Sequence, residues 1–286
     1  MGKKKADRTP FTFTEALRAR RGFRIADVDP RSTPGFGGDK ADGQAMLEKL
    51  SDRASDLQER LFAESRQGGT RSILLIVQGM DTSGKGGIMR HVVGAVDPQG
   101  IHITSFKAPT KEELKHDFLW RIEAALPGPG MIGVFDRSQY EDVLVVRVHD
   151  LVPEEEWSQR YDLIKDFEKK VAASGTRIIK VMLHISPEEQ KERLTERLER
   201  PDKHWKYNPK DVDERQLWDA YMEAYEAAVG KTSLNDAPWF VVPADRKWYA
   251  RLAVMGLLTE ALEDMDPQWP AADFDPMVEI ARVANT

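Results

Sequence analysis

The residues with the clearest chemical potential lie between positions 79 and 87, where glycines surround a single lysine. The stretch reads Gly-Met-Asp-Thr-Ser-Gly-Lys-Gly-Gly. Glycines let backbone N–H groups converge on phosphate oxygens, and a helix that begins there adds the positive end of its dipole. A lysine after the second glycine reaches the terminal phosphates of such a ligand. We therefore predict Lys85 as a catalytic cation in a phosphate-binding loop that also comprises Gly79, Met80, Thr82, Ser83, Gly84, Gly86 and Gly87.

Two positions in this loop depart from the usual pattern. Gly86 stands where Ser or Thr normally supplies a hydroxyl to Mg²⁺. Asp81 places a carboxylate where it would repel phosphates unless a cation lies between them. We predict that Asp81 restores the missing magnesium ligand or orients the acceptor. The alternatives are a structural glycine turn for the loop and an Asx turn for Asp81.

A second pair of polar residues, Asp136 and Arg137, follows the apolar run at 131–135. The carboxyl end of a buried strand is where α/β sheets bind ligands. Phosphate-loop enzymes place a carboxylate there that holds Mg²⁺, directly or through water. We predict Asp136 as the second metal ligand, with Arg137 beside it. The alternative is that Asp136 caps the next helix, with Arg137 as its salt-bridge partner.

A third signal is a basic cluster after residue 187. At about 100° per residue, three arginines share one face of a helix, and a basic stretch follows it. From Lys191 to Lys210 there are seven Lys or Arg against four Asp or Glu. Phosphoryl-transfer enzymes often close a mobile, arginine-rich lid over their substrates. We predict a lid at about residues 190–212 that binds phosphates through Arg193, Arg197, Arg200, Lys203, His204 and Lys206. A solvated helix with paired charges is the alternative.

These motifs need a scaffold that brings strand ends together. Short β-branched runs predict strands at 73–77, 101–106, 131–135, 178–185 and 239–242. Helical patterns occur at 39–67, 88–96, 109–126, on both sides of Pro153, and at 187–200, 212–229 and 248–262. The alternation predicts an α/β fold, a three-layer doubly wound parallel sheet of about five strands with helices on both faces and a helical lid.

The same patterns suggest how the chain is divided. We expect a partly irregular N-terminal extension at 1–38, one domain at 39–266 and a loose C-terminal tail at 267–286. Lys3 to Lys5 are expected to form a solvated part of the extension.

Composition excludes several classes of protein. The 286 residues contain no cysteine, so disulfides, thiolate nucleophiles and cysteine metal sites are ruled out. No apolar stretch approaches the length of about 18 residues that a membrane span needs, and Met1 to Lys5 lack the apolar core of a signal peptide. The net charge of −6 argues against a general nucleic-acid binder. We expect a cytoplasmic protein with neither nucleic-acid nor membrane partners.

Taken together, the motifs resemble the type-2 polyphosphate kinase family, phosphate-loop kinases related in fold to thymidylate kinase. The resemblance spans about 35–262 and is carried by the segments 79–86, 117–121, 136–145, 199–206 and 237–239. It implies Mg²⁺-dependent phosphoryl transfer between inorganic polyphosphate and a nucleotide (ADP/ATP or GDP/GTP). It also implies assembly as a homo-oligomer, a dimer or a tetramer.

Carried over by position, the resemblance implies catalytic roles for Asp81, Lys85, Asp136, Arg137 and Arg197. His204 departs from the family pattern, because many members have arginine there. The family divides by acceptor, monophosphate or diphosphate, and we favour diphosphates. Two other functions stay open: an ATP-dependent nucleoside or nucleotide kinase, and a non-catalytic nucleotide-binding switch. Lys85, Asp136 and the lid argue against the switch.

Overall fold

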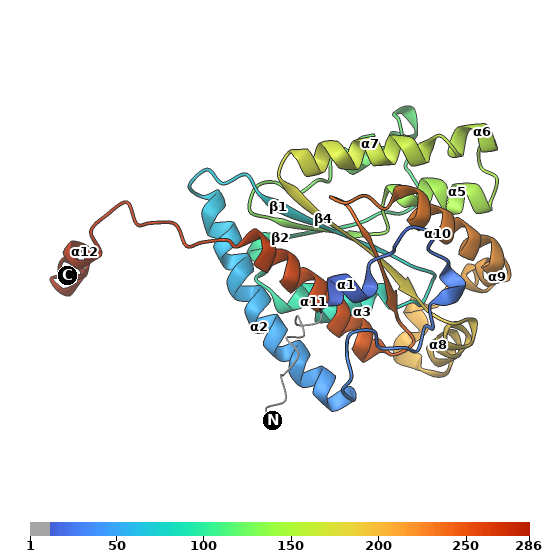
Figure 1. Cartoon of the computed structure of the whole chain (residues 1–286), viewed down its shortest axis with the longest axis horizontal. Helices are drawn as coiled ribbons and strands as arrows, with labels where there is room; N and C mark the ends of the chain where they lie inside the picture. Colours follow the sequence, from blue (N-terminus) through green and yellow to red (C-terminus); the bar gives the residue numbers. More distant parts are fainter. Residues whose placement is uncertain (1–11) are drawn as a thin grey trace, which may run out of the picture.

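The structure, a computed structural model, describes residues 12–286 and is built around one five-stranded parallel sheet (Figure 1). The strands are β1 (Ser72–Gln78), β2 (Ile101–Ser105), β3 (Ile132–Asp136), β4 (Thr176–His184) and β5 (Trp239–Pro243). Their order is β2-β3-β1-β4-β5, with β1 in the centre. The chain builds one half of the sheet beside β1 and then crosses to build the other half. Ligands of such sheets bind at the carboxyl ends of the strands, near this change of direction.

The central strand divides the interior into two cores. All seven residues of β1 are buried, as expected for a strand covered on both faces. Because successive side chains point to opposite faces, Ile73, Leu75 and Val77 enter one core, whereas Leu74 and Ile76 enter the other.

Helices cover both faces of the sheet (Figure 1). The first core packs against α1 (Phe13–Leu17), α2 (Lys40–Ser65), α3 (Lys85–His91) and α11 (Lys247–Met265). The second packs against α5 (Val145–Val148), α6 (Glu154–Trp157), α7 (Arg160–Ala173) and α10 (Trp218–Thr232). The predicted three-layer doubly wound fold is confirmed.

The predicted lid region consists of three short elements beyond β4. Ser186 caps α8 (Pro187–Glu199), and the 3-10 helix η6 (Pro201–Lys206) and α9 (Lys210–Gln216) follow it. The basic stretch that follows the arginine-bearing helix is therefore mostly helical. The predicted helix at 212–229 is wrong in detail, because it breaks at Leu217 into α9 and α10.

Two other helix predictions were too long. The helix predicted at 109–126 is reduced to the 3-10 helix η4 (Glu113–Lys115) and α4 (Trp120–Glu123). Between them the Asp117 side chain accepts a hydrogen bond from the Leu119 N–H (2.9 Å), a local bond that competes with a continuous helix. The helix predicted after Pro153 is divided into α6 and α7. The remaining 3-10 helices are η1 (Ile25–Asp27), η2 (Val93–Ala95), η3 (Pro98–Gly100) and η5 (Gln139–Val143).

The segments at the two ends differ in how they contact the body. Phe13 and Leu17 of α1 belong to the first core, and the Phe13 N–H donates to the Glu260 carboxylate (2.8 Å). The C-terminal tail contains α12 (Pro276–Ala284), which stands away from the body (Figure 1). Lys3 to Lys5 lie outside the described residues. Within residues 12–286, no helix combines the length and apolar character needed to cross a membrane.

Candidate active site

The loop after β1 has a conformation that requires glycine at two positions. Gly79 has φ +151°, and a Cβ there would lie 2.7 Å from the Leu183 carbonyl oxygen. Gly84, with φ +115°, is the residue from which α3 begins. A Cβ at Gly86 would meet no atom within 4 Å. The loop thus turns sharply from the central strand into α3, as a phosphate-binding loop must.

Lys85 is the first residue of α3 and points back over the loop. Its ammonium donates hydrogen bonds to the carbonyl oxygens of Gly79 (2.7 Å) and Met80 (3.3 Å). Burial lowers the pKa of Lys85 below its ordinary value, whereas the nearby carboxylates of Asp81 and Asp136 oppose this shift. The lysine is therefore held at the loop, near the carboxylates of Asp81 and Asp136.

Asp136 and Arg137 lie where the sequence placed them, at the carboxyl end of β3. Asp136 ends the strand and is in register with Val77 of β1. The helix cap that follows is Ser138, whose hydroxyl accepts a hydrogen bond from the Tyr140 N–H, so Asp136 is free of that role. Arg137 pairs with Asp81 across the strand ends (3.1 Å). Its φ of +65° is rare for a residue with a side chain and costs of order 1–3 kcal/mol.

Glu141 is a site residue that the sequence reasoning missed. Its carboxylate lies 3.7 Å from the Arg137 guanidinium. The side-chain amide of Gln78 donates a hydrogen bond from its nitrogen to Glu141 Oε1 (3.1 Å). Its oxygen accepts a hydrogen bond from Ser138 Oγ (3.0 Å). Burial raises the pKa of Glu141 above its ordinary value, and Arg137 and Lys85 oppose this shift. Glu141 lies in segment 136–145, which carries part of the family resemblance, and this position is the signal that could have identified it from the sequence.

The three arginines of α8 differ in what they contact. Arg193 is buried (5% exposed) and donates to the carbonyl oxygens of Thr82 (2.8 Å) and Ala244 (2.6 Å), so it fixes the loop to the lid helix. Arg197 contacts the Asp211 carboxylate of α9 (3.2 Å) and the Lys206 carbonyl oxygen (3.0 Å). Asp211 was not predicted from the sequence.

The outer lid residues are more exposed. Arg200 pairs with Glu196 and Asp202. A ring nitrogen of His204 lies 2.8 Å from the Leu198 carbonyl oxygen. Lys203 and Lys206 line the cleft described next, whereas His204 is not among its lining residues.

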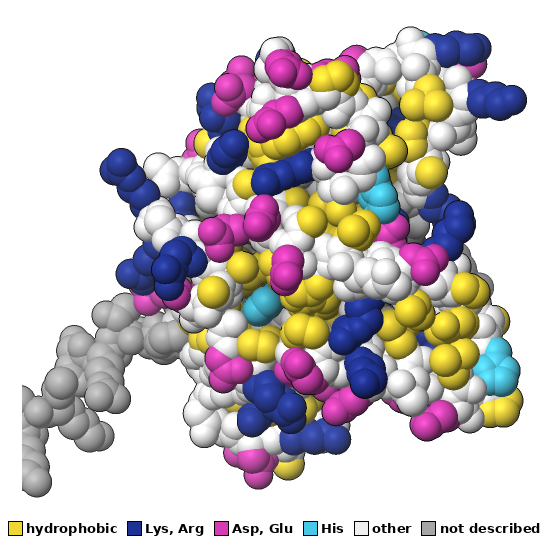
Figure 2. Space-filling model, turned by 90° about the vertical axis from the view of Figure 1, so that its right-hand side faces the viewer, with side chains coloured by type: hydrophobic (Ala, Val, Ile, Leu, Met, Phe, Trp, Pro, Cys, Tyr) yellow, Lys and Arg dark blue, Asp and Glu magenta, His cyan; other side chains and the backbone are white. Residues whose placement is uncertain are grey.

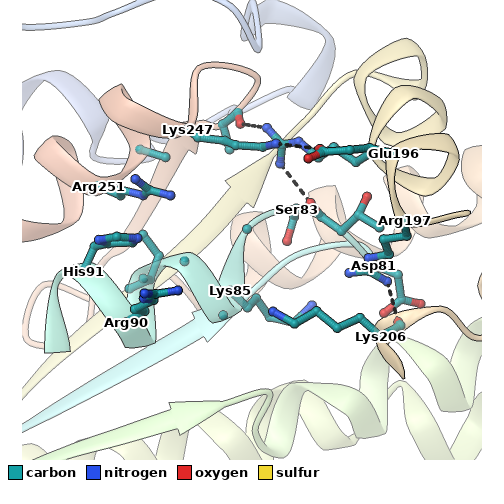
Figure 3. Close-up of a pocket in the computed structure, with 18 of the residues that line it drawn as sticks. Asp81, Ser83, Lys85, Arg90, His91, Glu196, Arg197, Lys206, Lys247 and Arg251 are labelled. Atoms are coloured by element: carbon teal, nitrogen blue, oxygen red, sulfur yellow. Dashed lines mark hydrogen bonds and ion pairs between the residues drawn. The ribbon is translucent and has the colours of Figure 1, made fainter. Parts of the chain in front are cut away.

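A cleft of about 410 Å³ extends from the loop along α3, α8 and α11. Its walls hold nine Lys or Arg against three Asp or Glu, a formal excess of six positive charges. Four basic residues lie along α3 and α11 (Figure 3): Arg90, His91, Lys247 and Arg251, of which Lys247 also lies 3.4 Å from the Glu196 carboxylate of α8. We call these four residues the far bank. The sequence did not reveal it, because α3 and α11 are separated by more than half of the chain.

The far bank is crowded with like charges. Burial lowers the pKa of Arg251, and Arg90 and Arg193 lower it further. Burial also lowers the pKa of His91, with contributions from Arg251 and Arg90. By contrast, Lys and Arg mix with Asp and Glu on the outer face that carries α8 and α9 (Figure 2). The excess positive charge is thus concentrated inside the cleft, where it can attract a polyanion.

The carboxylates of the site are suited to a cation that takes its other ligands from a substrate. Asp81 and Asp136 both line the cleft beside Lys85. Within residues 12–286, no cluster of three or more His, Cys, Asp or Glu side chains could hold a metal ion by itself. One or two carboxylates completed by phosphate oxygens and water are a common arrangement for Mg²⁺. The donor set therefore fits a divalent cation that arrives with phosphates.

Comparison with known proteins gives consistent results. The family model described as polyphosphate kinase 2 matches residues 37–270. An AMP/ADP-polyphosphate phosphotransferase of Meiothermus ruber is 45% identical over 248 residues, which cover 87% of this chain and 91% of the relative. An ADP-polyphosphate phosphotransferase of Rhodopseudomonas palustris is also 45% identical, over 79% of this chain and 81% of the relative.

A solved structure gives the same relationship. The crystal structure of polyphosphate kinase 2 from Arthrobacter aurescens TC1 superposes with a TM-score of 0.95 and 55% sequence identity. The match covers 97% of this chain and 98% of that one. The likeness therefore includes the sheet, the loop and the lid together.

Proposed function

Because the chain belongs to the polyphosphate kinase 2 family, we propose that it transfers a phosphoryl group between inorganic polyphosphate and a nucleoside diphosphate, ADP or GDP. Nucleoside monophosphates are proposed as further acceptors. The observation that carries this proposal is the cleft, in which basic residues lie on both sides of the loop. A nucleotide with two or three phosphates would occupy only part of such a site. Polyphosphate, a longer polyanion, suits its whole length.

The proposed reaction needs a cation between the phosphates and the carboxylates. Mg²⁺ would be held by Asp81 and Asp136 together with phosphate oxygens, and it would neutralise charge on the transferring group. The buried hydroxyls of Thr82 and Ser83 have no hydrogen-bond partner within the described chain. These unpaired groups are consistent with a loop whose polar contacts are completed by a ligand.

The protein's own groups supply position and charge. Lys85 would turn from the loop carbonyls to the phosphates, and Arg137, fixed between Asp81 and Glu141, would contact the group in transfer. Arg197 would leave Asp211 when the lid closes on the substrate. Cations held in these positions once the substrate is bound would favour the charge of the transition state over that of the ground state. No covalent intermediate with the protein is required.

The test is a coupled assay with ADP, long-chain polyphosphate and Mg²⁺, in which ATP formation is measured. ATP formation that depends on all three components is expected. A parallel assay supplies ATP with nucleosides or nucleoside monophosphates and no polyphosphate. Turnover in the second assay alone would reject the proposal in favour of an ATP-dependent nucleotide kinase. Assembly as a dimer or tetramer and a cytoplasmic location stay predictions from the sequence.

A further inference from the structure

A buried polar network lies directly behind the segment that carries Arg137. It connects side chains of the following residues, each no more than 1% exposed: Gln139, Tyr140, Glu168, Lys180, Thr232 and Trp239. They come from η5, α7, β4, α10 and β5. The six residues are called the buried network below, and none of them lines the cleft.

The centre of the buried network is an ion pair between Lys180 and Glu168 (2.6 Å). The Lys180 ammonium also donates to the Tyr140 hydroxyl (3.0 Å) and to the Thr232 carbonyl oxygen (2.8 Å). All three donor positions of the ammonium are therefore used. Burial lowers the pKa of Lys180 and raises that of Glu168, and each charge opposes the shift of the other.

Glu168 also binds the segment that follows Arg137. Its Oε1 accepts hydrogen bonds from the Tyr140 hydroxyl (2.7 Å) and from the Gln139 side-chain amide (3.0 Å). Ser138, the next residue toward Arg137, is fully buried and is bound by Gln78 of the central strand. Three consecutive residues after Arg137 are thus fixed by hydrogen bonds to neighbouring elements.

Stability alone does not explain why a lysine and a glutamate occupy this core. A buried ion pair can often be replaced by apolar residues of similar volume without loss of stability, because desolvation offsets the attraction. The segment it holds, however, contains a backbone that needs support. Arg137 has a positive φ, and such strain persists only where the surrounding structure fixes it.

We propose that Lys180 and Glu168 are positioning residues that hold η5, and through it Arg137, in the geometry that phosphoryl transfer requires. This inference rests on the proposed function for its kinetic readout. Neither residue touches the substrate. Their effect passes through Gln139, Tyr140 and the strained backbone of Arg137 to the guanidinium beside Asp81.

The experiment replaces the ion pair by apolar residues in the full-length protein, Lys180→Met with Glu168→Leu. We expect the variant to stay folded with a lower midpoint of thermal unfolding, because the buried Gln139 amide and the Thr232 carbonyl oxygen lose their partners. We expect kcat of the folded protein to fall about 10- to 100-fold, because a displacement of about 1 Å can cost that much. The KM for ADP should stay within a factor of about three of the wild-type value, because no residue of the buried network lines the cleft. Tyr140→Phe, which removes only a hydroxyl, serves if the double variant does not fold. Lys169 is an exposed lysine on α7, the helix that carries Glu168, and Lys169→Met is the matched control.

Amide hydrogen exchange supplies a readout that does not depend on turnover. Amides of residues 136–141 should exchange faster in the double variant than in the wild type, while those of β1 and β4 stay protected. A folded double variant with unchanged kcat and unchanged exchange at 136–141 would overturn the proposal. So would a fall in kcat that merely follows the fraction of unfolded protein. If the wild type shows no turnover with polyphosphate, the proposed function fails, and the exchange experiment still tests the buried network.

Discussion

The Arg137 guanidinium lies 3.1 Å from the Asp81 carboxylate, so an ion pair joins the loop after β1 to the end of β3. A cation that binds Asp81 must compete with this arginine or share the carboxylate with it. The pair therefore links metal binding to the position of the arginine that is proposed to contact the transferring phosphate.

The first prediction concerns the metal. Asp81→Asn and Asp136→Asn should each raise the Mg²⁺ concentration needed for half-maximal activity, because each removes one anionic ligand. Asp264→Asn, which changes an exposed aspartate paired with Arg177, is the control and should leave that concentration unchanged. Full activity in excess chelator, or an unchanged magnesium requirement in both site variants, would contradict the prediction.

The second prediction concerns Lys85. Lys85→Ala removes a charge from the transferring phosphates, and the loss of one such contact costs roughly 2.7–4 kcal/mol, or about 10²–10³ in kcat. Steady-state kinetics with ADP and polyphosphate measure the change, with Lys169→Ala on the exposed side of α7 as the control. Near-normal turnover in a folded Lys85→Ala protein would reject the phosphate-binding loop.

The third prediction uses the raised pKa of Glu141. Because this pKa lies above the ordinary value of 4.5, the folded protein takes up a proton at a pH where the unfolded chain does not. As the pH falls through this range, the group should therefore increase stability, while activity falls because Arg137 loses an anionic partner. Glu141→Gln should abolish both this loss of activity at acidic pH and the matching change in the free energy of unfolding. If Glu141→Gln loses activity over the same acidic pH range as the wild type, another group is responsible for that loss.

The fourth prediction compares two glycines of the loop. Gly79→Ala places a Cβ against the Leu183 carbonyl oxygen and should lower both stability and kcat. Gly86→Ala adds a methyl group in open space on a helix and should stabilise the protein by up to about 1 kcal/mol. Thermal unfolding of both variants tests the loop conformation. Equal behaviour of the two would show that the turn is not as described.

The fifth prediction concerns the far bank. Arg90→Ala and Arg251→Ala should raise the KM for long-chain polyphosphate and weaken its dependence on salt, by analogy with counterion release from nucleic acids. The KM for ADP should change little. Arg177→Ala, on the amino-terminal part of β4, is the matched control. If both site variants keep the wild-type salt dependence, polyphosphate does not lie along this side of the cleft.

Much of the fold could be predicted because β-branched runs and glycine-rich turns are local signals. All five strands were placed within about two residues, a precision typical of strong patterns. The helix predicted at 109–126 was wrong, since the side chain of Asp117 forms a local turn that the apolar spacing does not reveal. The division at Leu217 likewise has no strong breaker in the sequence.

The site was predicted where its residues follow strands, as with Lys85 and Asp136. The family resemblance is confirmed, whereas the roles of individual residues stay predictions. Periodicity placed Arg193 on a basic face but did not indicate that its guanidinium would bind backbone carbonyls of the loop. The far bank and the Lys180–Glu168 pair depend on contacts between distant segments, for which a single sequence carries no signal.

The separation of α12 from the body has a practical consequence. Gln67 still holds the linker through the Ala271 carbonyl oxygen (3.0 Å), and residues 271–275 are all exposed. An exposed segment between the body and a helix that stands away from it is a preferred site of proteolytic cleavage. Limited digestion should therefore cut the chain between Ala271 and Asp275 and release α12, while the strands, the loop and the lid stay in one fragment.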